Sequence, residues 1–344
     1  MNSQWKAFLE SRSAEFDQEG NVRFPDAPLE ADCALMDLSQ LGLIGVCGPE
    51  AASFLQGQLT NDVVGLSESK SQLGSHCNHK GRMLASFRVF KLEGTVYLQL
   101  PRTQVEAMVQ RLRMYLLRTE AAVEDVSGRF ASIALAGYCA PSLLGARFDA
   151  VPQQENALSR SGELTAIRIP GDRPRFEILG PATSMEAMWD ALATAATVAN
   201  ADYWALLDIR AGIPSIYPQT SDTFVPQMTN LHLVDGVSFK KGCYTGQEVV
   251  ARMQYLGKLK RRMYLAQVSA ENRPTPGDVL HCPSSRSEQA AGRVVDARPD
   301  RHGDYELLVV VQIDAVQQGE VRLGGPEGPL LSFSDPPYGF PAEG

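Results

Sequence analysis

The pattern of apolar and polar residues changes at about residue 262, and this change constrains the fold more than any other feature of the chain. Before it, segments with helical spacing alternate with segments that have the two-residue period of strands. After it, three strand-like segments are separated by Gly and Pro, at residues 263–268, 292–297 and 305–313. We therefore expect an α+β region over residues 1–262, a small β-barrel over residues 263–334 and an irregular tail over residues 335–344.

Local patterns in the first region predict individual elements. Residues 86–90 and 95–100 alternate as the two strands of a hairpin. Residues 105–116 have apolar side chains at helical spacing, and Pro49 in a first-turn position predicts a helix with Phe54, Leu55, Leu59 and Val63 on its apolar face. The Thr183-x-x-Glu186 pattern is a capping box, which predicts a further helix whose buried side carries Met185, Met188, Trp189 and Leu192.

Size and composition limit the class of protein. A chain of 344 residues is long for one core, so about two or three domains are expected, with a candidate joint at residues 140–156. The first residues contain no apolar signal core, and no run reaches the roughly 20 apolar residues of a membrane span. We therefore expect a cytoplasmic protein without a membrane partner.

Charge and cysteine usage narrow the class further. A net charge of -8 disfavours a dedicated nucleic-acid surface. The one compact basic cluster, Lys258, Lys260, Arg261 and Arg262, is typical of a solvated surface. The six cysteines are far apart and include no C-x-x-C pair, so they fit neither a zinc ribbon nor a disulfide framework. Reduced thiols are therefore expected.

Residues 241–262, KGCYTGQEVVARMQYLGKLKRR, contain the densest chemistry. Thr245 and Glu248 have capping-box spacing, and Val249, Met253 and Leu256 predict an apolar helix face that ends at Gly257. Cys243 then lies just before a helix amino terminus, where unpaired N–H groups and nearby lysines would lower its thiol pKa. Glu248 and Arg252 would pair across one helix turn, and Gln247 would reach backbone amides. The equally weighted alternative is a tight glycine turn in which Cys243 is only a small packing residue.

Other chemical motifs are weak or absent. His76, Cys77 and His79 are too closely spaced for an unstrained metal site, so a turn leading into the next strand is expected there. The chain has no G-x-S-x-G for a serine triad and no Walker A sequence for phosphoryl transfer.

Five blocks, in this order, resemble the YgfZ family of folate-binding, tRNA-modifying proteins across nearly the whole chain: FLQGQLTNDV, HCNHKGRMLASFRVF, DYWALLDIRAGIPSI, FVPQMTNL and VSFKKGCYTGQEVVARMQYLGKLKRR. The K-G-C-Y-x-G-Q-E signature is highly specific. The resemblance implies a fold like the T-protein of the glycine cleavage system, with intertwined α+β subdomains around a central hole and a carboxy-terminal β-barrel. It also implies binding of tetrahydrofolate or a folate derivative.

The same resemblance implies a role in assembling or repairing iron-sulfur clusters of client enzymes, among them a tRNA methylthiotransferase. Cys243 is the functional thiol that it implies. The other positions that match the signature are Lys241, Gly242, Tyr244, Gly246, Gln247, Glu248 and the trailing basic residue Arg252.

For the folate, Trp204 matches a tryptophan that the family associates with the ligand, while Gln227 and Asn230 would serve the polar edge of the pterin. Core packing alone is an equally weighted explanation for Trp204. A second family tryptophan falls at Leu41 here, which leaves the aromatic clamp one-sided. An acidic pterin contact of the T-protein falls at Arg210, which cannot accept the same hydrogen bonds.

The catalytic aspartate of the T-protein has no counterpart in GRMLASFRVF. We therefore expect no cleavage of an aminomethyl intermediate. The favoured hypothesis is an accessory factor that binds folate and uses Cys243 in iron-sulfur maintenance. Two alternatives stay open: a folate-dependent one-carbon transferase with an unknown acceptor, and an adaptor with a vestigial folate site that docks a partner through the basic cluster from Lys258.

Overall fold

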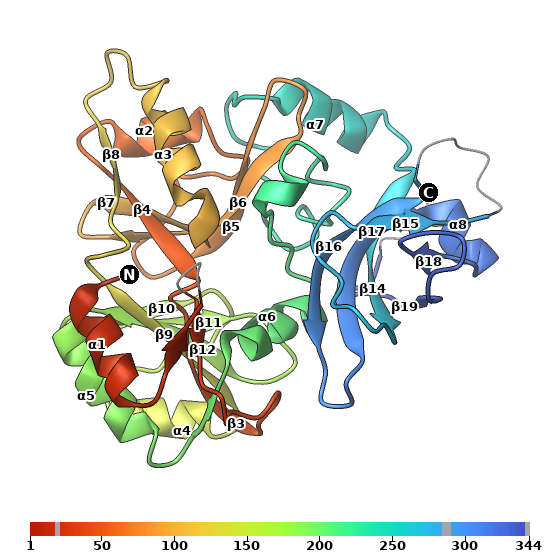
Figure 1. The fold of residues 1–344 in the computed structure, drawn as a ribbon. Helices are drawn as coiled ribbons and strands as arrows, with labels where there is room; N and C mark the ends of the chain where they lie inside the picture. Colours follow the sequence, from red (N-terminus) through yellow and green to blue (C-terminus); the bar gives the residue numbers. More distant parts are fainter. Residues whose placement is uncertain (18–20, 284–289, 341–344) are drawn as a thin grey trace. The chain divides into compact units, whose positions relative to one another are not determined.

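The computed structural model describes residues 1–17, 21–283 and 290–340, which form two compact units (Figure 1). Each unit combines segments that are distant in sequence. The first unit comprises Met1–Phe54, Gly65–Gln72 and Arg88–Trp204, and the second comprises Leu55–Val64, Leu73–Phe87 and Ala205–Gly344.

The first unit contains a six-stranded sheet in the order β10-β11-β12-β9-β3-β13. Neighbouring strands are antiparallel except β13, which runs parallel to β3. Its strands are β3 (Cys33–Asp37), β9 (Ala131–Gly137), β10 (Leu158–Ser161), β11 (Leu164–Ile169), β12 (Arg175–Gly180) and β13 (Thr197–Ala199).

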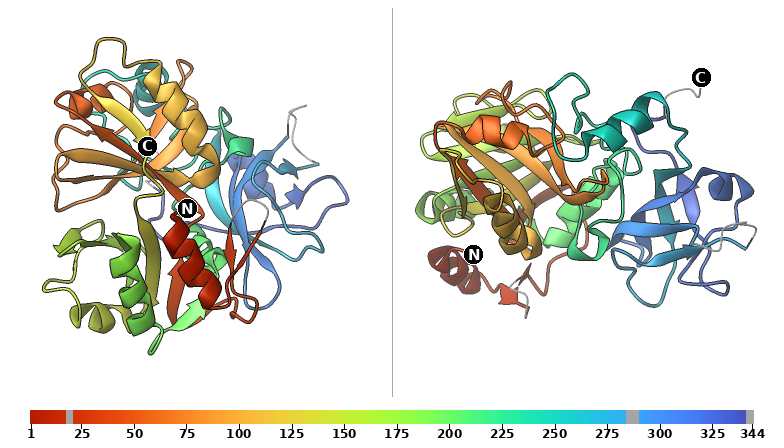
Figure 2. Two further views of the ribbon diagram at one scale, coloured as in Figure 1. Left: turned by 60° about the vertical axis from the view of Figure 1, so that its left-hand side comes forward. Right: turned by 90° about the horizontal axis from the view of Figure 1, so that it is seen from above.

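Three helices contribute to the core against this sheet: α1 (Ser3–Ser11), α4 (Ala140–Gly145) and α5 (Ala182–Leu192), with α1 and α5 side by side (Figure 2). The rings of Trp5 and Trp189 meet edge to face with centroids 5.9 Å apart. The four residues expected on the buried side of α5 are all buried, so this face is confirmed.

A second sheet of the first unit has β4 (Leu41–Cys47) between β7 (Thr95–Pro101) and β8 (Ala122–Asp125). Residues 88–92 of β6 (Met83–Leu92) pair with β7, which confirms the expected hairpin. Helix α3 (Val105–Arg113) packs on β4 and β8. Its buried residues are Val105, Met108, Val109 and Leu112, as the helical spacing predicts, but the helix ends before Tyr115 and Leu116. The remaining elements of the unit are β1 (Glu15–Phe16), β2 (Val22–Arg23), η1 (Arg102–Gln104) and the starts of α2 (Ala51–Gln56) and α6 (Ala201–Arg210).

In the second unit, the residues after 260 form a curled antiparallel sheet, a half-barrel with the strand order β18-β15-β16-β17-β14-β19. Its concave core includes Leu280, Val294, Leu307 and Val309. The expected strands are therefore confirmed. Their bounds are β14 (Arg261–Val268), β15 (Val279–His281), β16 (Gly292–Pro299), β17 (Tyr305–Gln312), β18 (Arg322–Leu323) and β19 (Ser332–Ser334), with α8 (Ile313–Gln318) after β17.

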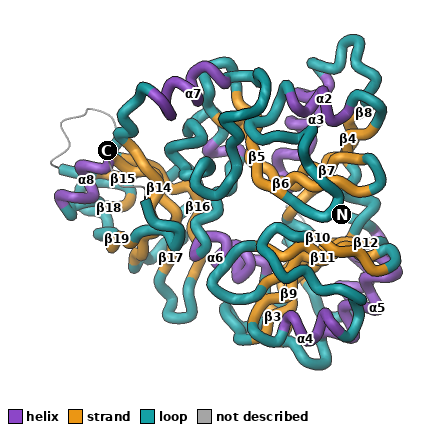
Figure 3. The backbone as a smooth tube through the Cα atoms, turned by 180° about the vertical axis from the view of Figure 1, so that it is seen from behind, coloured by secondary structure: helices purple, strands orange, loops and turns teal. Residues whose placement is uncertain are grey.

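The rest of the second unit is mainly loop. Between α6 and α7 (Gln247–Tyr255), the chain contains no regular element except the short turn η2 (Pro218–Thr220), as the long teal path in Figure 3 shows. Strand β5 (Gln72–Cys77) precedes β6, and the first half of β6 anchors this loop, because the Met83 N–H donates to the Phe224 carbonyl at 2.8 Å. The part of the chain that the structure describes has no helix long and apolar enough to cross a membrane.

Two expected helices differ from the structure, α5 at its start and α2 at its end. Helix α5 is preceded by Pro181, which is extended and caps nothing with its side chain, so the capping box at Thr183 is wrong. Thr183 lies inside the first turn because the proline already stops the helix from extending backwards. Helix α2 spans only Ala51–Gln56, so Leu59 and Val63 are buried outside a helix.

The expectation of reduced thiols is wrong for Cys33 and Cys139, which form a disulfide. Strands β3 and β9 are neighbours, and their register places Cys33 opposite Gly137. Cys139 follows two residues later, with its Cα 5.8 Å from that of Cys33. Because 106 positions separate the two cysteines, their spacing in sequence gives no sign of this pairing.

Burial raises the pKa of the Asp37 carboxyl to about 6, although Trp5 and Ser39 donate hydrogen bonds to it. The native state therefore binds this proton more tightly than the unfolded chain, where the ordinary value is 3.8. The resulting stabilisation is present below about pH 4 and is lost as the pH rises to about 6. Relative to Asp37→Asn, we expect the natural protein to lose about 1 kcal/mol of unfolding free energy between about pH 5 and pH 7. Urea unfolding of both proteins measures this, and parallel pH profiles would contradict it.

Candidate functional site

The signature cysteine lies on a loop of the second unit, directly before helix α7. Cys243 and its neighbour Gly242 are both exposed. A Cβ added at Gly242 would meet no described residue within 4 Å. The backbone around the thiol is therefore open to solvent, and the contacts that fix the loop come from the residues on either side.

Lys241 fixes the loop on one side. Its ammonium donates to three backbone carbonyls, those of Gln56 at 2.6 Å, Leu59 at 2.6 Å and Asn61 at 2.9 Å. Burial lowers the pKa of Lys241 to about 8, so the group is still protonated and donating at pH 7. Lys241 therefore holds residues 241–244 against the segment 55–61. Its ammonium is bound by backbone carbonyls and is not the free charge that was expected beside the thiol.

Tyr244 fixes the other side of the thiol. Its ring is buried and lies under the Lys241 ammonium, with Nζ 5.0 Å from the ring centroid. Its backbone N–H donates to Gln247 Oε1 at 3.3 Å, which confirms that Gln247 reaches the backbone. Burial is also the main reason that the Tyr244 pKa is raised. Cys243 is thus an exposed residue between two anchored ones.

Gly246 brings the loop into contact with the turn between β5 and β6. Its φ is +84°, and a Cβ there would lie 2.4 Å from the Asn78 carbonyl oxygen and 2.9 Å from Gly81 Cα. Gly81 is confined in the same way, because a Cβ added to it would lie 2.9 Å from Val249 Cβ. Both glycines are needed for backbone approach, which agrees with the expected turn of the signature.

Helix α7 begins at Gln247, with Gly246 as a cap that has no side-chain hydrogen bond. The expected capping box of Thr245 and Glu248 is therefore wrong, because the left-handed glycine already sets the start of the helix. The expected apolar face is wrong at Leu256, which is 85% exposed, whereas Val249 and Met253 are half-buried and Val250 is the buried residue of the helix. Among the described residues, the exposed Glu248 and Arg252 form no ion pair with each other.

The free thiols differ strongly in environment. Cys77 is buried, and burial raises its thiol pKa to about 12, whereas Cys243 and Cys47 are exposed. His76 and Cys77 end strand β5 and His79 follows in the turn, and His76 Nδ1 is 3.0 Å from the Gln58 carbonyl oxygen. No group of three or more potential metal ligands occurs among residues 1–17, 21–283 and 290–340.

The candidate folate residues do not form one cluster within either unit. Trp204 and Leu41 belong to the first unit. Trp204 is 4% exposed, and the Arg175 guanidinium carbon lies 4.8 Å from its ring centroid. Leu41 lines a cavity of about 30 Å³, which has room for a water molecule but not for a pterin. Both observations favour a packing role for these two side chains.

Gln227 and Asn230 lie together in the second unit, where both line a cavity of about 300 Å³. Their amide nitrogens are used within the protein: Gln227 donates to the Val250 carbonyl at 2.7 Å, and Asn230 donates to the Met263 carbonyl at 2.8 Å. Their side-chain oxygens are buried and accept no hydrogen bond from the described residues. Both oxygens are thus buried acceptors with almost no surface exposed to solvent.

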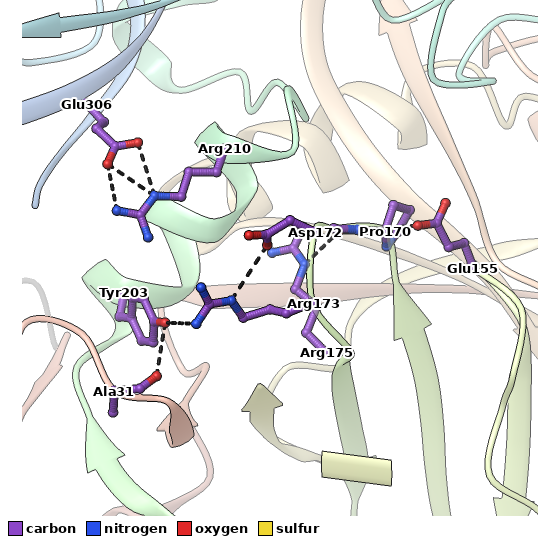
Figure 4. A network of polar contacts seen from close by, with 10 residues as sticks. Ala31, Glu155, Pro170, Asp172, Arg173, Arg175, Tyr203, Arg210 and Glu306 are labelled. Carbon is purple, nitrogen blue, oxygen red and sulfur yellow. Dashed lines mark hydrogen bonds and ion pairs between the residues drawn. The ribbon is translucent and has the colours of Figure 1, made fainter. Parts of the chain in front are cut away.

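Arg210 pairs with Glu306, whose carboxylate it contacts at 2.6 Å through a terminal nitrogen and at 3.1 Å through Nε (Figure 4). Its guanidinium is therefore engaged in structural support of the second unit. Figure 4 also shows, within the first unit, Arg173 donating to the Tyr203 hydroxyl, which in turn donates to the Ala31 carbonyl.

The expected basic cluster does not act as one surface. Lys258 and Lys260 are exposed. Arg261 donates to the Ala290 carbonyl at 2.9 Å, and the Arg262 guanidinium carbon lies 4.3 Å from the centroid of the Phe340 ring. Only the two lysines therefore present their charge mainly to solvent.

Comparison with known proteins agrees with this architecture. Residues 27–240 match the GCVT N-terminal domain family. The chain resembles the tRNA-modifying protein YgfZ of Colwellia psychrerythraea, at 33% identity over 261 residues that cover 76% of this chain and 80% of the relative. It also resembles the tRNA-modifying protein YgfZ of Serratia proteamaculans, at 30% identity over 93% of this chain and 97% of the relative.

Among solved structures, the glycine cleavage system aminomethyltransferase T of Bartonella henselae matches with a TM-score of 0.77. The match covers 98% of each chain at 18% identity. At 18% identity, this structural similarity establishes the T-protein fold but does not establish an activity.

Proposed function

Because the chain belongs to the YgfZ family of tRNA-modifying proteins, we propose that it supports tRNA modification as a folate-binding accessory protein whose functional thiol is Cys243. Its proposed task is the assembly or repair of iron-sulfur clusters in client enzymes, such as a tRNA methylthiotransferase. The link to tRNA is thus indirect, through the client, in keeping with a net charge of -8.

The observation that carries this proposal is the exposed thiol on an anchored loop. Lys241 and Tyr244 hold the backbone on both sides of Cys243, and Gly246 holds the loop against the β5–β6 turn. Such a thiol can approach a large partner while its backbone keeps one position. Cys243 supplies one ligand, whereas iron-sulfur clusters usually take four, so we propose transient contact with sulfur, iron or a client thiol at this residue.

Gln227 and Asn230 support the proposed binding of folate. A pterin carries N–H donors, and the acceptor oxygens of Gln227 and Asn230 suit them. These two residues would hold its polar edge, and the folate would supply a one-carbon carrier. Trp204 and Leu41 are not placed in this role, because Trp204 is buried beside Arg175 and Leu41 lines a space the size of a water molecule.

The experiment that tests the function compares Cys243→Ala with Cys47→Ala in cells that lack their own family member. Both thiols are exposed, so the two substitutions are matched in environment. We expect Cys243→Ala to lose the ability to restore methylthiolated tRNA, measured by mass spectrometry of nucleosides, and Cys47→Ala to retain it. Full activity of Cys243→Ala would overturn the proposed role of the thiol.

The same assay separates the alternatives. An adaptor would instead lose activity on charge reversal of Lys258 and Lys260. A transferase would depend most on the proposed folate residues, so substitution of Gln227 or Asn230 would cost at least as much activity as Cys243→Ala. Release of formaldehyde or ammonia from an aminomethylated carrier would contradict the expectation that the chain does not cleave such an intermediate.

A further inference from the structure

The outward side of helix α7 carries two large apolar side chains that are open to solvent. Tyr255 is 70% exposed and Leu256 is 85% exposed, at the carboxyl end of the helix. The opposite side of the helix is buried through Val250. Single exposed apolar residues are common on proteins, so these two indicate a binding surface only if the groups around them form one surface with them.

Helical spacing adds two charged residues to the same side. Glu248, Arg252 and the pair Tyr255 and Leu256 follow one another at intervals of three or four positions, which aligns them along one face. Glu248 and Arg252 are exposed. We call these four residues the α7 face. It begins directly after the loop that carries Cys243, so the exposed thiol and the exposed apolar pair lie at the two ends of the same helix.

Phe239 orients the apolar end of the α7 face. Its ring meets the Tyr255 ring nearly edge on, with a centroid distance of 6.1 Å and an interplanar angle of 70°. Phe239 itself is half-buried and stands four positions before Cys243 in the chain. The Tyr255 ring is thus held on one side and open on the other. An aromatic side chain that is already oriented loses little conformational entropy on binding, which suits it to anchor a protein interface.

The charge around the α7 face is opposite to that of the whole chain. Residues 240–262 contain seven basic residues and one acidic residue, whereas the chain has a net charge of -8. Lys240 and Arg252 are exposed, and neither forms an ion pair within the part of the chain that the structure describes. Their charges are therefore free to attract an acidic partner and to repel a basic one.

We propose that the α7 face, together with Phe239, is the docking surface for an acidic, cysteine-bearing segment of a client protein, which it directs to Cys243. The identity of the client rests on the proposed function. Iron-sulfur proteins hold their clusters through cysteine thiolates, so a client without its cluster has such cysteines free. The nine residues of α7 span about 13 Å, which is about four residues of extended chain. A client side chain four positions from its cysteine would therefore reach Tyr255 and Leu256.

The test measures disulfide exchange between the full chain and designed peptides. It uses a Cys47→Ala background, in which Cys243 is the exposed free thiol that remains among the described residues. Each peptide has one cysteine, activated as its 2-thiopyridyl disulfide. The Cys243 thiolate attacks the peptide sulfur, the protein–peptide disulfide forms and 2-thiopyridone leaves, so absorbance gives the second-order rate constant.

Three peptides separate the apolar contact from the charge. The first has a leucine four positions from its cysteine and two glutamates between them. The second has serine in place of the leucine, and the third has lysines in place of the glutamates. We expect the first to react at least about fivefold faster than either of the others. High salt should reduce the difference between the first and third peptides and preserve that between the first and second.

Matched variants locate the contact. Leu256→Ser and Tyr255→Ser should each remove the preference for the leucine peptide. Their controls are Leu117→Ser and Tyr138→Ser, because Leu117 is 94% and Tyr138 is 80% exposed in the first unit. Both controls should keep the preference. The small reagent 2,2′-dithiodipyridine does not extend to the α7 face, so its equal rate with all four variants would show that the thiol itself is unchanged.

The outcomes distinguish this inference from the proposed function. Equal rates for the three peptides, or a preference that persists in Leu256→Ser, would overturn the docking surface. The proposed function would still stand if Cys243→Ala fails to restore methylthiolated tRNA. A preference that Leu256→Ser removes supports the docking surface, and full activity of Cys243→Ala would then contradict the proposed function alone. Binding of a single-stranded RNA decamer that Tyr255→Ser abolishes, without peptide preference, would assign the surface to RNA and overturn the protein partner.

Discussion

Lys241→Met is expected to release the loop that carries Cys243 and to lower the free energy of unfolding by about 2–4 kcal/mol. The substitution keeps the length and the apolar stem of the side chain but removes the ammonium. The carbonyls of Gln56, Leu59 and Asn61 then lose their shared donor. Each unpaired carbonyl in a buried site costs about 1–3 kcal/mol, and the half-buried position of Lys241 lets water recover part of that loss.

Lys240→Met is the matched control, because the neighbouring lysine is exposed. Tryptophan fluorescence would miss the effect, since Trp5, Trp189 and Trp204 all belong to the first unit. Hydrogen exchange measured by mass spectrometry reports on the second unit directly, and amides of residues 237–246 should exchange faster in Lys241→Met alone. Equal exchange in both variants would show that the three-carbonyl contact does not hold the loop.

The helices and strands that could be predicted from sequence are those whose buried residues follow the spacing of a regular helix or strand. Strand β17 is an almost continuous apolar run, and α5 has its buried residues at helical spacing. Local pattern fails where a tertiary contact decides. The Cys33–Cys139 disulfide depends on the pairing of β3 with β9, and the start of α7 depends on how closely Gly246 approaches Asn78.

The same distinction applies to the site. The signature correctly locates Cys243 in a turn before a helix, and the structure adds that this cysteine is exposed. It misassigns Lys241, because the carbonyls that bind the ammonium come from a segment about 180 residues earlier, and residue types alone do not reveal such a partner. His232, Met253 and Phe340 were not anticipated either, since they become neighbours only around a cavity of the folded second unit.

Gly246→Ala is expected to be the most damaging conservative substitution in the signature, lowering the free energy of unfolding by about 2–5 kcal/mol. The new methyl group would lie 2.4 Å from the Asn78 carbonyl oxygen, and neither can move without the backbone, because the methyl is bonded to Cα and the carbonyl is part of the main chain. The left-handed φ of +84° adds about 1–2 kcal/mol for any residue with a Cβ. The loop would have to withdraw from the β5–β6 turn, which would also displace the start of α7.

Gly242→Ala, four positions earlier in the same loop, provides the control because its added methyl group has no neighbour within 4 Å in the part of the chain that the structure describes. Urea unfolding followed by far-ultraviolet circular dichroism should therefore separate the two alanine variants, with Gly242→Ala close to the natural protein. Equal stability of both would mean that Gly246 does not need its close approach to Asn78. A stable Gly242→Ala that nevertheless loses activity in the tRNA assay would place Gly242 at the contact with the client, because none of the described residues covers its surface.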